Sequence, residues 1–381
     1  MPQSASDRKR IALVIHALHG GGAERLMSQL AARWSHNHDV HLITWSKIET
    51  DKYTVPNYVT RHGLDLMRPS SNAIQGIFAN FKRVRELKRC LSKISPDFVL
   101  SFSDQTNIVT LQATSNLSRA RRIPVWISEH SDPAKQRLSR LWEAWRNRVY
   151  PRATGCVVLT KEIASYFERW VPASKIRVIP PALTPLQDPP RAWTDRSKRI
   201  LFVGRLSREK RVELLVEAWK IAANDLSDWN LEIVGDGEER AQLERLAQSC
   251  NRIKFHGWIS NREQIDALYS DSKIFVLTSI YEGFPVALIE ALNQGLAAVS
   301  TDCSTALLPL NEPHKVVRIA QNDAPQGVAD EIVAAANSSK KENWQPEQAV
   351  QAASRFHWPQ IGMLWDKILE SKSDKGLSQT P

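Results

Sequence analysis

The sequence predicts an α/β protein made of two tandem, doubly wound domains, each built on a parallel sheet. Short apolar runs of strand length alternate with helical segments, as expected when helices cover both faces of a parallel sheet. This alternation occurs twice, over residues 11–183 and 199–303. A stretch rich in proline and polar residues, Thr184 to Lys198, separates the two series and predicts a linker. With 381 residues the chain is long enough for two separate cores.

The first series starts with an apolar run at residues 11–18 that is short enough for a buried parallel strand. The glycines of HGGGAER, residues 19–25, then lead into a helix whose Leu26, Leu30 and Trp34 recur at helical spacing. The next strand is DVHLITWS, so residues 11–46 form a predicted β-loop-α-β unit. Further strands are predicted at residues 96–103, 123–130, 154–160 and 175–183.

The second series repeats this organisation and ends in a long apolar helix. Strands are predicted at residues 199–206, 230–237, 253–260, 273–279 and 297–303, and helices at residues 210–223, 238–250, 262–270 and 286–295. The last predicted helix, RFHWPQIGMLWDKILE, carries an apolar face, and the residues after it are predicted to be a disordered tail.

Composition excludes several classes of protein. Hydrophobic residues make up 42% and charged residues 24%, as in soluble globular proteins, and no run approaches the roughly 18 apolar residues that span a bilayer. The start, RKRIALVIHAL, lacks the cleavage site of a signal peptide, because it leads into glycines and a helix. The four cysteines are far apart and form no C-x-x-C pair, which predicts a reduced, cytoplasmic chain without disulfides or a zinc site.

Charge is unevenly distributed along the chain. Residues 1–185 carry 28 Lys and Arg against 14 Asp and Glu, whereas residues 186–381 carry 23 against 27. A basic half is typical of proteins that bind nucleic acid, an anionic membrane or an acidic acceptor, although a merely soluble basic surface explains it too. Two basic stretches, FKRVRELKRCLSKI and RLSRLWEAWRNRVY, are predicted to be amphipathic helices able to lie on an anionic membrane, or else ordinary solvated helix faces.

The segment EGFPVALIE, residues 282–290, carries the strongest indication of chemistry. Gly283 allows close backbone approach, and Pro285 suits the first helical position, so Glu282 and Glu290 are predicted to bracket a helix N-terminus. Free amides there favour phosphate, and carboxylates on either side favour hydroxyls. The pattern fits a nucleotide-sugar; the plain alternative is a surface acid in front of an amphipathic helix.

This E-x7-E pattern, with G-F-P behind its first glutamate, resembles the signature of the retaining GT-B glycosyltransferases of family 4. The similarity runs through nearly the whole chain and is strongest over residues 200–303. It implies two Rossmann-like domains facing an interdomain cleft, with an acceptor-side domain at 1–184 and a nucleotide-sugar domain at 185–355. A C-terminal helix at 356–371 would cross back to the first domain, ahead of a disordered tail at 372–381.

The resemblance also implies roles for residues of the second domain. In VGRLSREK, Arg205 and Lys210 would bind the donor diphosphate, while Glu282 would hold hydroxyls of the sugar and Glu290 the ribose. The loops IVGDGEER and FHGWIS would surround the base and ribose, although both suit tight turns as well. The further donor-binding residues implied are Gly204, Asp236, Trp258, Gly283, Phe284, Val286 and Ala287.

In the first domain the resemblance points to two loops. Gly21 and Gly22 of HGGGAER would approach the donor or acceptor, although a plain tight turn fits the same residues. His130 of SEHSDP would contact the transferred sugar near the reaction centre, with a helix cap or a satisfied loop histidine as alternatives. Its neighbour Glu129 is a further candidate.

Two sequence features bear on the donor. The segment STALLPLNEPHKVV after Cys303 lacks the glycine-proline loop usual in the family, so donor geometry or choice is expected to differ. No Asp-x-Asp pair occurs, and the basic groups named above are expected to replace the electrostatic role of a metal ion, so no cofactor is predicted.

The predicted function is transfer of a hexose or N-acetylhexosamine from a UDP-linked donor to a lipid-linked or polysaccharide acceptor in cell-envelope glycan biosynthesis. The expected catalytic residues are Glu282, His130, Arg205 and Lys210. A cytoplasmic location is expected, with peripheral contact between the basic N-terminal domain and the inner face of the membrane, and no nucleic-acid partner. Two alternatives stay open: a GT-B sugar-nucleotide epimerase, and a non-enzymatic nucleic-acid-binding protein.

Overall fold

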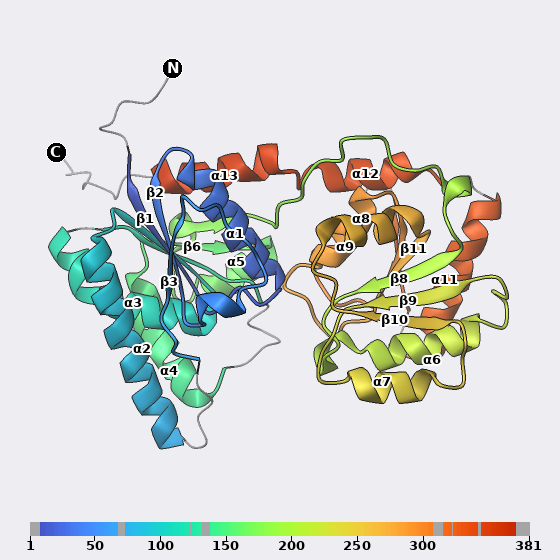
Figure 1. Ribbon diagram of the computed structural model, residues 1–381, viewed down its shortest axis with the longest axis horizontal. Coiled ribbons are helices and arrows are strands. Elements are labelled where there is room, and N and C mark those ends of the chain that lie inside the picture. The colour runs from blue at the N-terminus through green and yellow to red at the C-terminus, as the bar shows by residue number, and fades with distance from the viewer. Residues whose placement is uncertain are drawn as a thin grey trace. The chain divides into compact units, whose positions relative to one another are not determined.

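The computed structural model consists of two compact α/β units (Figure 1). Unit 1 comprises residues 1–181 and 361–381, and unit 2 comprises residues 182–360. The boundaries predicted from the sequence lie at 184 and 355. The structure describes residues 8–67, 73–121, 123–131, 138–307, 315–321, 323–341 and 344–370. The predicted tail at 372–381 lies outside them.

Unit 1 is built on a seven-stranded parallel sheet with the order β3-β2-β1-β4-β5-β6-β7. Its strands are β1 (Arg10–Ile15), β2 (Asp39–Thr44), β3 (Thr60–Gly63), β4 (Phe98–Phe102), β5 (Val125–Ser128), β6 (Gly155–Val158) and β7 (Ile176–Val178). The central strands are apolar and buried because helices cover both faces of the sheet. The edge strand β3, TRHG, is partly exposed and polar, so apolar patterning does not predict it.

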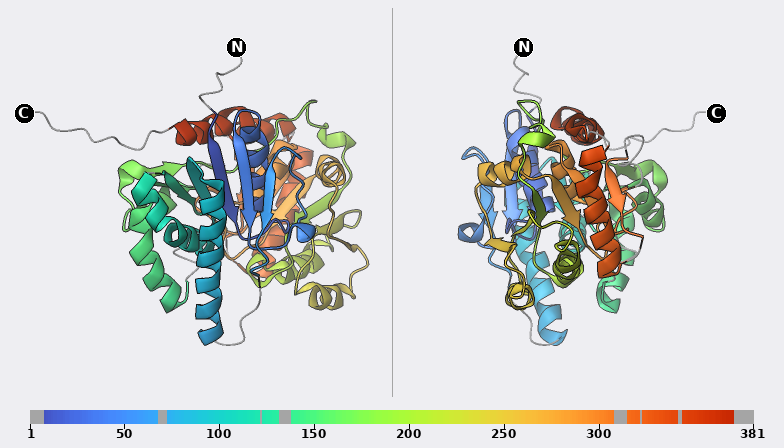
Figure 2. Two further views of the ribbon diagram at one scale, coloured as in Figure 1. Left: turned by 60° about the vertical axis from the view of Figure 1, so that its left-hand side comes forward. Right: turned by 90° about the vertical axis from the view of Figure 1, so that its right-hand side faces the viewer.

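Helices of unit 1 cover this sheet, and Figure 2 shows β1 and β2 side by side with α13 near their amino ends. They are α1 (Gly22–Ser35), α2 (Ala73–Ile94), α3 (Asp104–Arg121), α4 (Arg140–Val149), α5 (Lys161–Phe167) and α13 (Trp358–Glu370), whose last turns belong to this unit. The helix predicted after the first glycines is therefore present, and the preceding strand ends at Ile15, earlier than predicted.

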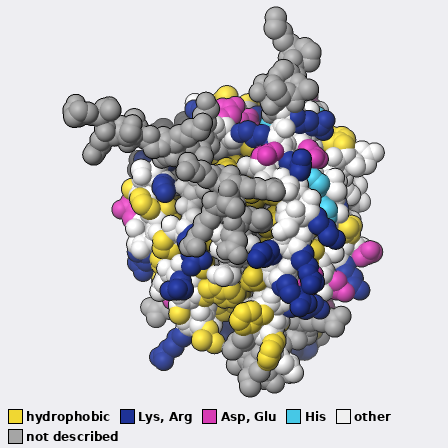
Figure 3. All heavy atoms as spheres, turned by 90° about the vertical axis from the view of Figure 1, so that its left-hand side faces the viewer, with side chains coloured by type: hydrophobic (Ala, Val, Ile, Leu, Met, Phe, Trp, Pro, Cys, Tyr) yellow, Lys and Arg dark blue, Asp and Glu magenta, His cyan; other side chains and the backbone are white. Residues whose placement is uncertain are grey.

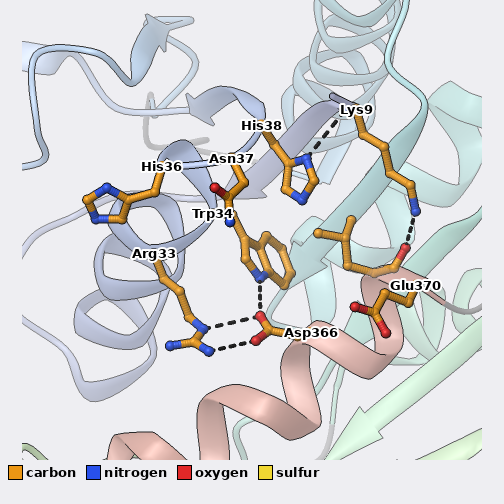
Figure 4. A pocket seen from close by; sticks show the side chains of 9 residues that line it. Lys9, Arg33, Trp34, His36, Asn37, His38, Asp366 and Glu370 are labelled. Atoms are coloured by element: carbon orange, nitrogen blue, oxygen red, sulfur yellow. Dashed lines mark hydrogen bonds and ion pairs between the residues drawn. The ribbon is translucent and has the colours of Figure 1, made fainter. Parts of the chain in front are cut away.

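Asp366 attaches α13 to α1 through three hydrogen bonds. Arg33 donates to it through Nε at 3.1 Å and Nη2 at 2.6 Å, and the Trp34 indole N–H donates at 3.0 Å (Figure 4). Trp365 is fully buried on the same helix, with its ring 5.6 Å from that of Phe102. A polar pocket opens beside this contact and is lined by Lys9, Arg33, Trp34, His36, Asn37, His38, Asp366, Leu369 and Glu370.

Unit 2 contains a six-stranded parallel sheet with the order β10-β9-β8-β11-β12-β13. The strands are β8 (Arg199–Val203), β9 (Asn230–Val234), β10 (Ile253–Gly257), β11 (Ile274–Leu277), β12 (Ala297–Ser300) and β13 (Val317–Ile319). Strand order runs outward in both directions from β8 and β11, which pair directly through Ile200 with Ile274 and Leu201 with Phe275. This junction is the topological switch point, where open α/β sheets place their ligands.

Six helices are described in unit 2, two of which are absent from the sequence prediction. They are α6 (Val212–Ala222), α7 (Arg240–Ala247), α8 (Arg262–Asp271), α9 (Val286–Asn293), α11 (Pro325–Lys341) and α12 (Pro346–Ser354). The unpredicted α11 packs against α6, and α12 packs against α9. The sheets and helices of the two units thus confirm the predicted pair of Rossmann-like, doubly wound domains.

The stretch predicted as a linker is folded onto unit 2. Arg196 is buried within it and donates to the carbonyls of Arg191, Ser272 and Gln294. Its guanidinium satisfies carbonyls at the ends of α8 and α9, and burial lowers its pKa to about 10. The predicted linker thus begins just after the boundary between the units and packs on unit 2, and composition identified its prolines but not this buried arginine.

Glycines in unit 2 allow the loops after β8, β9 and β10 to lie against one another. Gly204 N donates to Val234 O at 3.0 Å, and Leu206 N donates to Asp236 O at 3.0 Å. Gly235 has φ +136°, and a Cβ on it would stand 1.8 Å from Gly204 O. Position 235 therefore requires glycine because the backbone of the neighbouring loop leaves no room for a side chain.

We predict that Gly235→Ala lowers the free energy of unfolding by at least about 2 kcal/mol, because it adds both left-handed backbone strain and a backbone clash. Thermal and urea unfolding would measure the loss. Gly21→Ala is the matched control, since a Cβ there would lie 3.5 Å from its nearest neighbour, in ordinary contact. Equal stability of Gly235→Ala and the natural protein would contradict this account.

Candidate active site

Lys210 and Glu282 meet at the switch point of unit 2. Lys210 lies in the loop after β8 and Glu282 in the loop after β11, and Lys210 Nζ lies 2.5 Å from Glu282 Oε1. Ser279 Oγ donates to the same oxygen at 2.7 Å, while the Glu282 side chain is 14% exposed. The structure therefore brings together two of the predicted catalytic residues, which are 72 positions apart.

Backbone contacts fix Lys210 in place. Its amide donates to Ser207 O at 2.9 Å, and its carbonyl accepts from Thr278 Oγ1 at 3.0 Å. Arg211 then adopts a left-handed conformation with φ 47° before α6 begins. Lys210 consequently lies in a short 3-10 turn ahead of α6, and not in the first turn of that helix as predicted.

Arg205 is exposed beside this pair. Its neighbour Gly204 is held by the carbonyl of Val234, so Arg205 leaves β8 at the sheet edge. Within the part of the chain that the structure describes, no hydrogen bond or ion pair engages its guanidinium. The Arg205 guanidinium is therefore available to bind an anionic ligand.

The amino end of α9 offers fewer free amides than the sequence suggests. Pro285 stands at the N-cap position, one residue earlier than predicted, and α9 begins at Val286. The amide of Val286 donates to Phe284 O at 2.9 Å, and those of Leu288 and Ile289 donate to Pro285 O. The Ala287 amide has no hydrogen-bond partner among the described residues, so it is the donor left for a ligand in this turn.

Glu290 is buried and already paired. Its side chain is 8% exposed, with Oε1 2.8 Å from Arg262 Nη1 and Oε2 3.3 Å from the Tyr269 hydroxyl. Asp266 binds the other side of the same guanidinium. Burial opposes the charge of Arg262, but Glu290 and Asp266 outweigh it and raise its pKa. Sequence reasoning missed this arginine, which precedes no recognisable motif.

The remaining candidates of unit 2 have mainly local contacts. Asp236 accepts from the Gly237 amide at 2.8 Å and from Arg240 at 3.0 Å. Trp258 is exposed after β10, and Gly283 is buried before α9. Phe284 is buried with its ring edge against that of Phe356, 5.3 Å away, which fixes the turn before α9.

In unit 1, Glu24 lies in the first turn of α1, and its carboxylate reaches back to the glycine-rich loop after β1. Its Oε2 accepts from the amides of Gly20 at 2.7 Å and Gly21 at 3.0 Å, and its Oε1 lies 3.1 Å from His16 Nε2. Burial would raise the pKa of Glu24, but the hydrogen bonds from His16, Gly21 and Gly20 outweigh it and lower the pKa. The Gly21 amide predicted to bind a ligand is thus bound by this carboxylate, and Gly22 begins α1.

His130 follows β5 and its ring packs at a tilt against Phe102 of unit 1. Its ring lies 4.4 Å from that of Phe102, and Nε2 lies 3.1 Å from Ser128 Oγ. Burial lowers the pKa of His130 to about 3, so the imidazole is neutral at physiological pH. It can hydrogen-bond to a hydroxyl but supplies no positive charge.

Glu129 lies in a buried polar cluster next to His130. Its Oε1 accepts from Asn107 Nδ2 at 2.9 Å and from the Tyr150 hydroxyl, and Asn107 Oδ1 in turn accepts from Ser101 Oγ at 2.7 Å. Burial, reinforced by the charge of Asp104, raises the pKa of Glu129 to about 7. Glu129 is therefore a structural carboxyl close to half-protonated at neutral pH.

Neither a metal site nor a membrane span is found in the described ranges. Across these residues no three His, Cys, Asp or Glu side chains group in a way that could hold a metal ion. The described helices include none with the length and apolar character to cross a bilayer. Of the altered segment after Cys303, residues 308–314 lie outside the described residues, so its consequence stays a prediction.

Two family descriptions match the chain in tandem. Residues 185–351 match "Glycosyl transferases group 1", and residues 21–182 match "Glycosyl transferase 4-like domain". Together they cover nearly all of both units. The chain belongs to the group 1 glycosyltransferases. The predicted family and transferase class are confirmed.

Curated relatives cover most of this glycosyltransferase. A Campylobacter jejuni enzyme named GalNAc-alpha-(1->4)-GalNAc-alpha-(1->3)-diNAcBac-PP-undecaprenol alpha-1,4-N-acetyl-D-galactosaminyltransferase is 29% identical over 77% of this chain and 79% of its own. The amylovoran biosynthesis glycosyltransferase AmsD of Erwinia amylovora is 27% identical over 78% of this chain and 82% of its own.

Solved structures share the GT-B fold. A sucrose-phosphate synthase from Thermosynechococcus elongatus aligns with a TM-score of 0.76 and 18% identity over 96% of this chain and all of its own. HepE from Anabaena, solved with UDP and glucose, aligns with a TM-score of 0.74 and 18% identity over 96% of this chain and all of its own. These likenesses confirm the predicted fold class.

We predict that the stability of the glycosyltransferase falls as pH rises from about 4.5 to about 7 through Glu129. Its ordinary pKa is 4.5, and its pKa in the folded protein is about 7, so the folded state holds a proton that the unfolded state releases. Glu129→Gln keeps the acceptor oxygen without the titration. It should raise the free energy of unfolding at pH 8 relative to the natural protein by up to about 3 kcal/mol.

Urea unfolding at a series of pH values measures this effect. The exposed Glu49→Gln is the control, and its stability should follow the pH dependence of the natural protein. A Glu129→Gln variant with an unchanged pH dependence would show that Glu129 is ionised in the folded state.

Proposed function

We propose that this glycosyltransferase moves a hexose or N-acetylhexosamine, with retention of anomeric configuration, from a UDP-linked donor to a lipid-linked or polysaccharide acceptor in cell-envelope glycan biosynthesis. The observation that carries the proposal is the Lys210–Glu282 pair at the switch point, with Arg205 beside it. The named activities of the Campylobacter and Erwinia relatives support the class of product.

The donor diphosphate is assigned to the cationic side of this site. Lys210 offers three N–H donors on a fixed backbone, and Arg205 offers a planar fork that is exposed for an oxygen pair. The Ala287 amide at the start of α9 supplies a further donor in the positive end of the helix dipole. The interaction of these groups with the diphosphate is strongest in the transition state, because negative charge builds up there on the leaving diphosphate.

The two carboxylates divide the hydroxyls between them. Glu282 uses Oε1 for Lys210 and Ser279, and its Oε2 has no hydrogen-bond partner in the described part of the chain, so Oε2 is assigned to hydroxyls of the sugar. Glu290 is assigned to the ribose.

The proposed reaction proceeds on one face of the sugar. The acceptor oxygen bonds to the anomeric carbon as the bond from that carbon to the diphosphate oxygen breaks, and the acceptor proton passes to an oxygen of the departing phosphate. Lys210 and Arg205 stabilise the negative charge that the diphosphate gains as its bond to the sugar breaks, which is why we propose that no metal ion is needed. Glu282 as a covalent nucleophile is the less favoured variant, because Lys210 and Ser279 already hold its Oε1.

The acceptor side of the proposal rests on unit 1. The neutral imidazole of His130 is placed at the carboxyl edge of the sheet, where it can hydrogen-bond to a hydroxyl of the sugar. Peripheral contact with an anionic membrane is part of the proposal because the acceptor is lipid-linked or polymeric. Nucleic acid is not a proposed partner.

A donor panel is the first test. We expect a UDP-sugar to raise the thermal unfolding midpoint by several degrees at concentrations well above its dissociation constant, and other nucleotide-sugars to raise it less. Proton NMR of the released or transferred sugar then reads its anomeric configuration. Inversion of configuration would refute retention, and an epimerised nucleotide-sugar formed without acceptor would support the epimerase instead.

Substitutions in the Lys210–Glu282 pair provide a second test. Lys210→Ala, Glu282→Ala and Arg205→Ala should each lower kcat/KM by about 100-fold or more, since each removes a group aimed at developing charge or at the sugar. Circular dichroism should show an intact fold. Arg208→Ala, which removes an exposed cation from the same loop, is the control and should retain near-natural transfer. Near-natural turnover in the first three variants would refute the assignment of Lys210, Glu282 and Arg205 to the catalytic site.

A further inference from the structure

The polar pocket between α1 and α13 lies at the amino edge of the unit 1 sheet and has a volume of about 520 Å³. Its walls come from Lys9 just before β1, from residues 36–38 between α1 and β2, and from the last turns of α13 (Figure 4). His130, by contrast, follows β5 at the carboxyl edge of the same sheet. This pocket, which we call the α1–α13 pocket, is therefore a separate site, and small-molecule sites commonly have volumes of about 300–1,000 Å³.

The charges in the walls of the pocket are balanced and mostly engaged. Arg33 donates twice to Asp366, and these hydrogen bonds raise the pKa of Arg33. Lys9 donates to the carbonyl of Leu369 at the end of α13, where the helix dipole favours a cation. Glu370 is the second acid, so the described lining residues carry two cations and two carboxylates.

The surface at this end of unit 1 has the same mixed character. The amino edge of the sheet is at the top of Figure 1, where α13 lies. Figure 3 shows acidic and basic side chains side by side at that upper end, whereas hydrophobic side chains gather lower on the face shown. A surface without an excess of either charge does not favour a phosphate or a metal ion. The described residues also contain no cluster of three side chains that could hold a metal.

His38 adds a neutral hydrogen-bond donor to the pocket. Its Nδ1 accepts from the Lys9 amide at 3.3 Å, which leaves the imidazole proton on Nε2. Burial lowers the pKa of His38, and the charge of Lys9 lowers it further, although Asp366 opposes this. The imidazole is therefore neutral at physiological pH.

Three polar groups of the pocket have no hydrogen-bond partner in the part of the chain that the structure describes. They are the side-chain amide of Asn37, Nε2 of His38 and the carboxylate of Glu370. The amide both donates and accepts, Nε2–H donates, and the carboxylate only accepts. A ligand with several hydroxyls can pair with all three groups, whereas an anion would be repelled by Glu370.

An exposed aromatic pair borders the pocket. Tyr58, in the loop before β3, is 53% exposed, and its ring lies 5.9 Å from that of His36 at an angle of 48°. Aromatic rings of this kind combine a large apolar face with a polar tip. They can pack against the C–H face of a sugar ring while its hydroxyls bind the polar groups beside it.

We propose that the α1–α13 pocket binds one neutral sugar unit of a glycan, with Asn37, His38 and Glu370 holding its hydroxyls and the Tyr58–His36 pair packing against its ring. The inference rests on the proposed function, because a lipid-linked or polysaccharide acceptor supplies the glycan. A strand of six residues spans about 20 Å, so a glycan bound at the amino edge must extend over several sugars to reach the carboxyl edge. The pocket would therefore favour long acceptors over short ones.

Ligand-observed NMR tests whether the full chain binds a sugar there. We expect saturation transfer to at least one of the methyl α-glycosides of glucose, galactose, N-acetylglucosamine and N-acetylgalactosamine. The Trp34 indole N–H, which donates to Asp366 in the pocket wall, reports the location. Its resonance, assigned by its absence in Trp34→Phe, should shift when the bound glycoside is added. No transfer to any of the four glycosides, or an unmoved Trp34 resonance, would overturn the proposal.

Substitutions at exposed positions test the assigned contacts without removing buried groups. Asn37→Ala/Glu370→Ala should weaken glycoside binding by about 10-fold or more, since it removes one neutral and one charged hydrogen-bonding group. Tyr58→Ala should weaken binding about fivefold. Glu162→Ala and Phe78→Ala, which remove an exposed carboxylate and an exposed ring elsewhere in unit 1, are the matched controls and should bind normally. Equal losses in variants and controls would refute the pocket as the binding site.

Competition and kinetics identify the kind of ligand. Displacement of the glycoside by inorganic phosphate would overturn the proposal in favour of an anion site. In transfer assays, Asn37→Ala/Glu370→Ala should raise KM about 10-fold for an acceptor of several sugars and leave KM for a single-sugar acceptor unchanged. An unchanged KM for the long acceptor would show that the pocket takes a free sugar and would refute its role in holding a glycan.

The same measurements separate the pocket from the proposed function. Transfer of sugar without glycoside binding at Trp34 would refute the pocket alone. Glycoside binding at Trp34 without transfer from any nucleotide-sugar would refute the proposed reaction alone.

Discussion

The parallel order of the unit 2 sheet determines where its charged side chains meet. Strands β8 and β11 are neighbours although more than 70 residues separate them, and both carboxyl ends lie at one edge, so Lys210 and Glu282 come into contact there. An ion pair this sheltered needs compensation for the water it loses. Three hydrogen bonds supply this compensation. Ser279 donates to the Glu282 carboxylate, Thr278 donates to the Lys210 carbonyl, and the Glu282 backbone N–H donates to the Cys303 carbonyl. Removing either partner leaves a charge without its counterpart.

Both acids of the E-x7-E pattern are held by a cation before any ligand arrives. Glu282 pairs with Lys210 from the loop after β8, and Glu290 pairs with Arg262 from the start of α8. Each carboxylate therefore keeps one orientation, which lowers the cost of ordering it when a hydroxyl binds. Asp266, one turn further along α8, binds the other side of the Arg262 guanidinium, so Arg262 is held in place where it contacts Glu290. The pattern thus depends on residues that lie outside it.

Sequence patterning predicted the buried elements and missed those whose stability depends on tertiary contacts. Continuous apolar runs gave nearly every central strand, whereas β3 is too short and polar to stand out and α12 relies on packing against α9. The acids and bases of the site were predicted by residue type and spacing. Their pairing was not, because Arg262 meets Glu290, 28 positions away, only through folding. Glu24 lies three positions after Gly21 and binds its amide locally, in the glycine-rich turn that was expected to approach a ligand.

The electrostatic division between the units follows from burial. The ring of His130 lies tilted against that of Phe102, and desolvation lowers the pKa of this imidazole to about 3, while burial raises the pKa of the neighbouring Glu129 to about 7. Neither group brings a positive charge to a diphosphate. In unit 2, Lys210 is paired with Glu282 and Arg205 is exposed at the same edge of the sheet. In the proposed reaction, Lys210 and Arg205 of unit 2 therefore supply positive charge for the leaving group, and His130 of unit 1 offers a neutral hydrogen-bonding group.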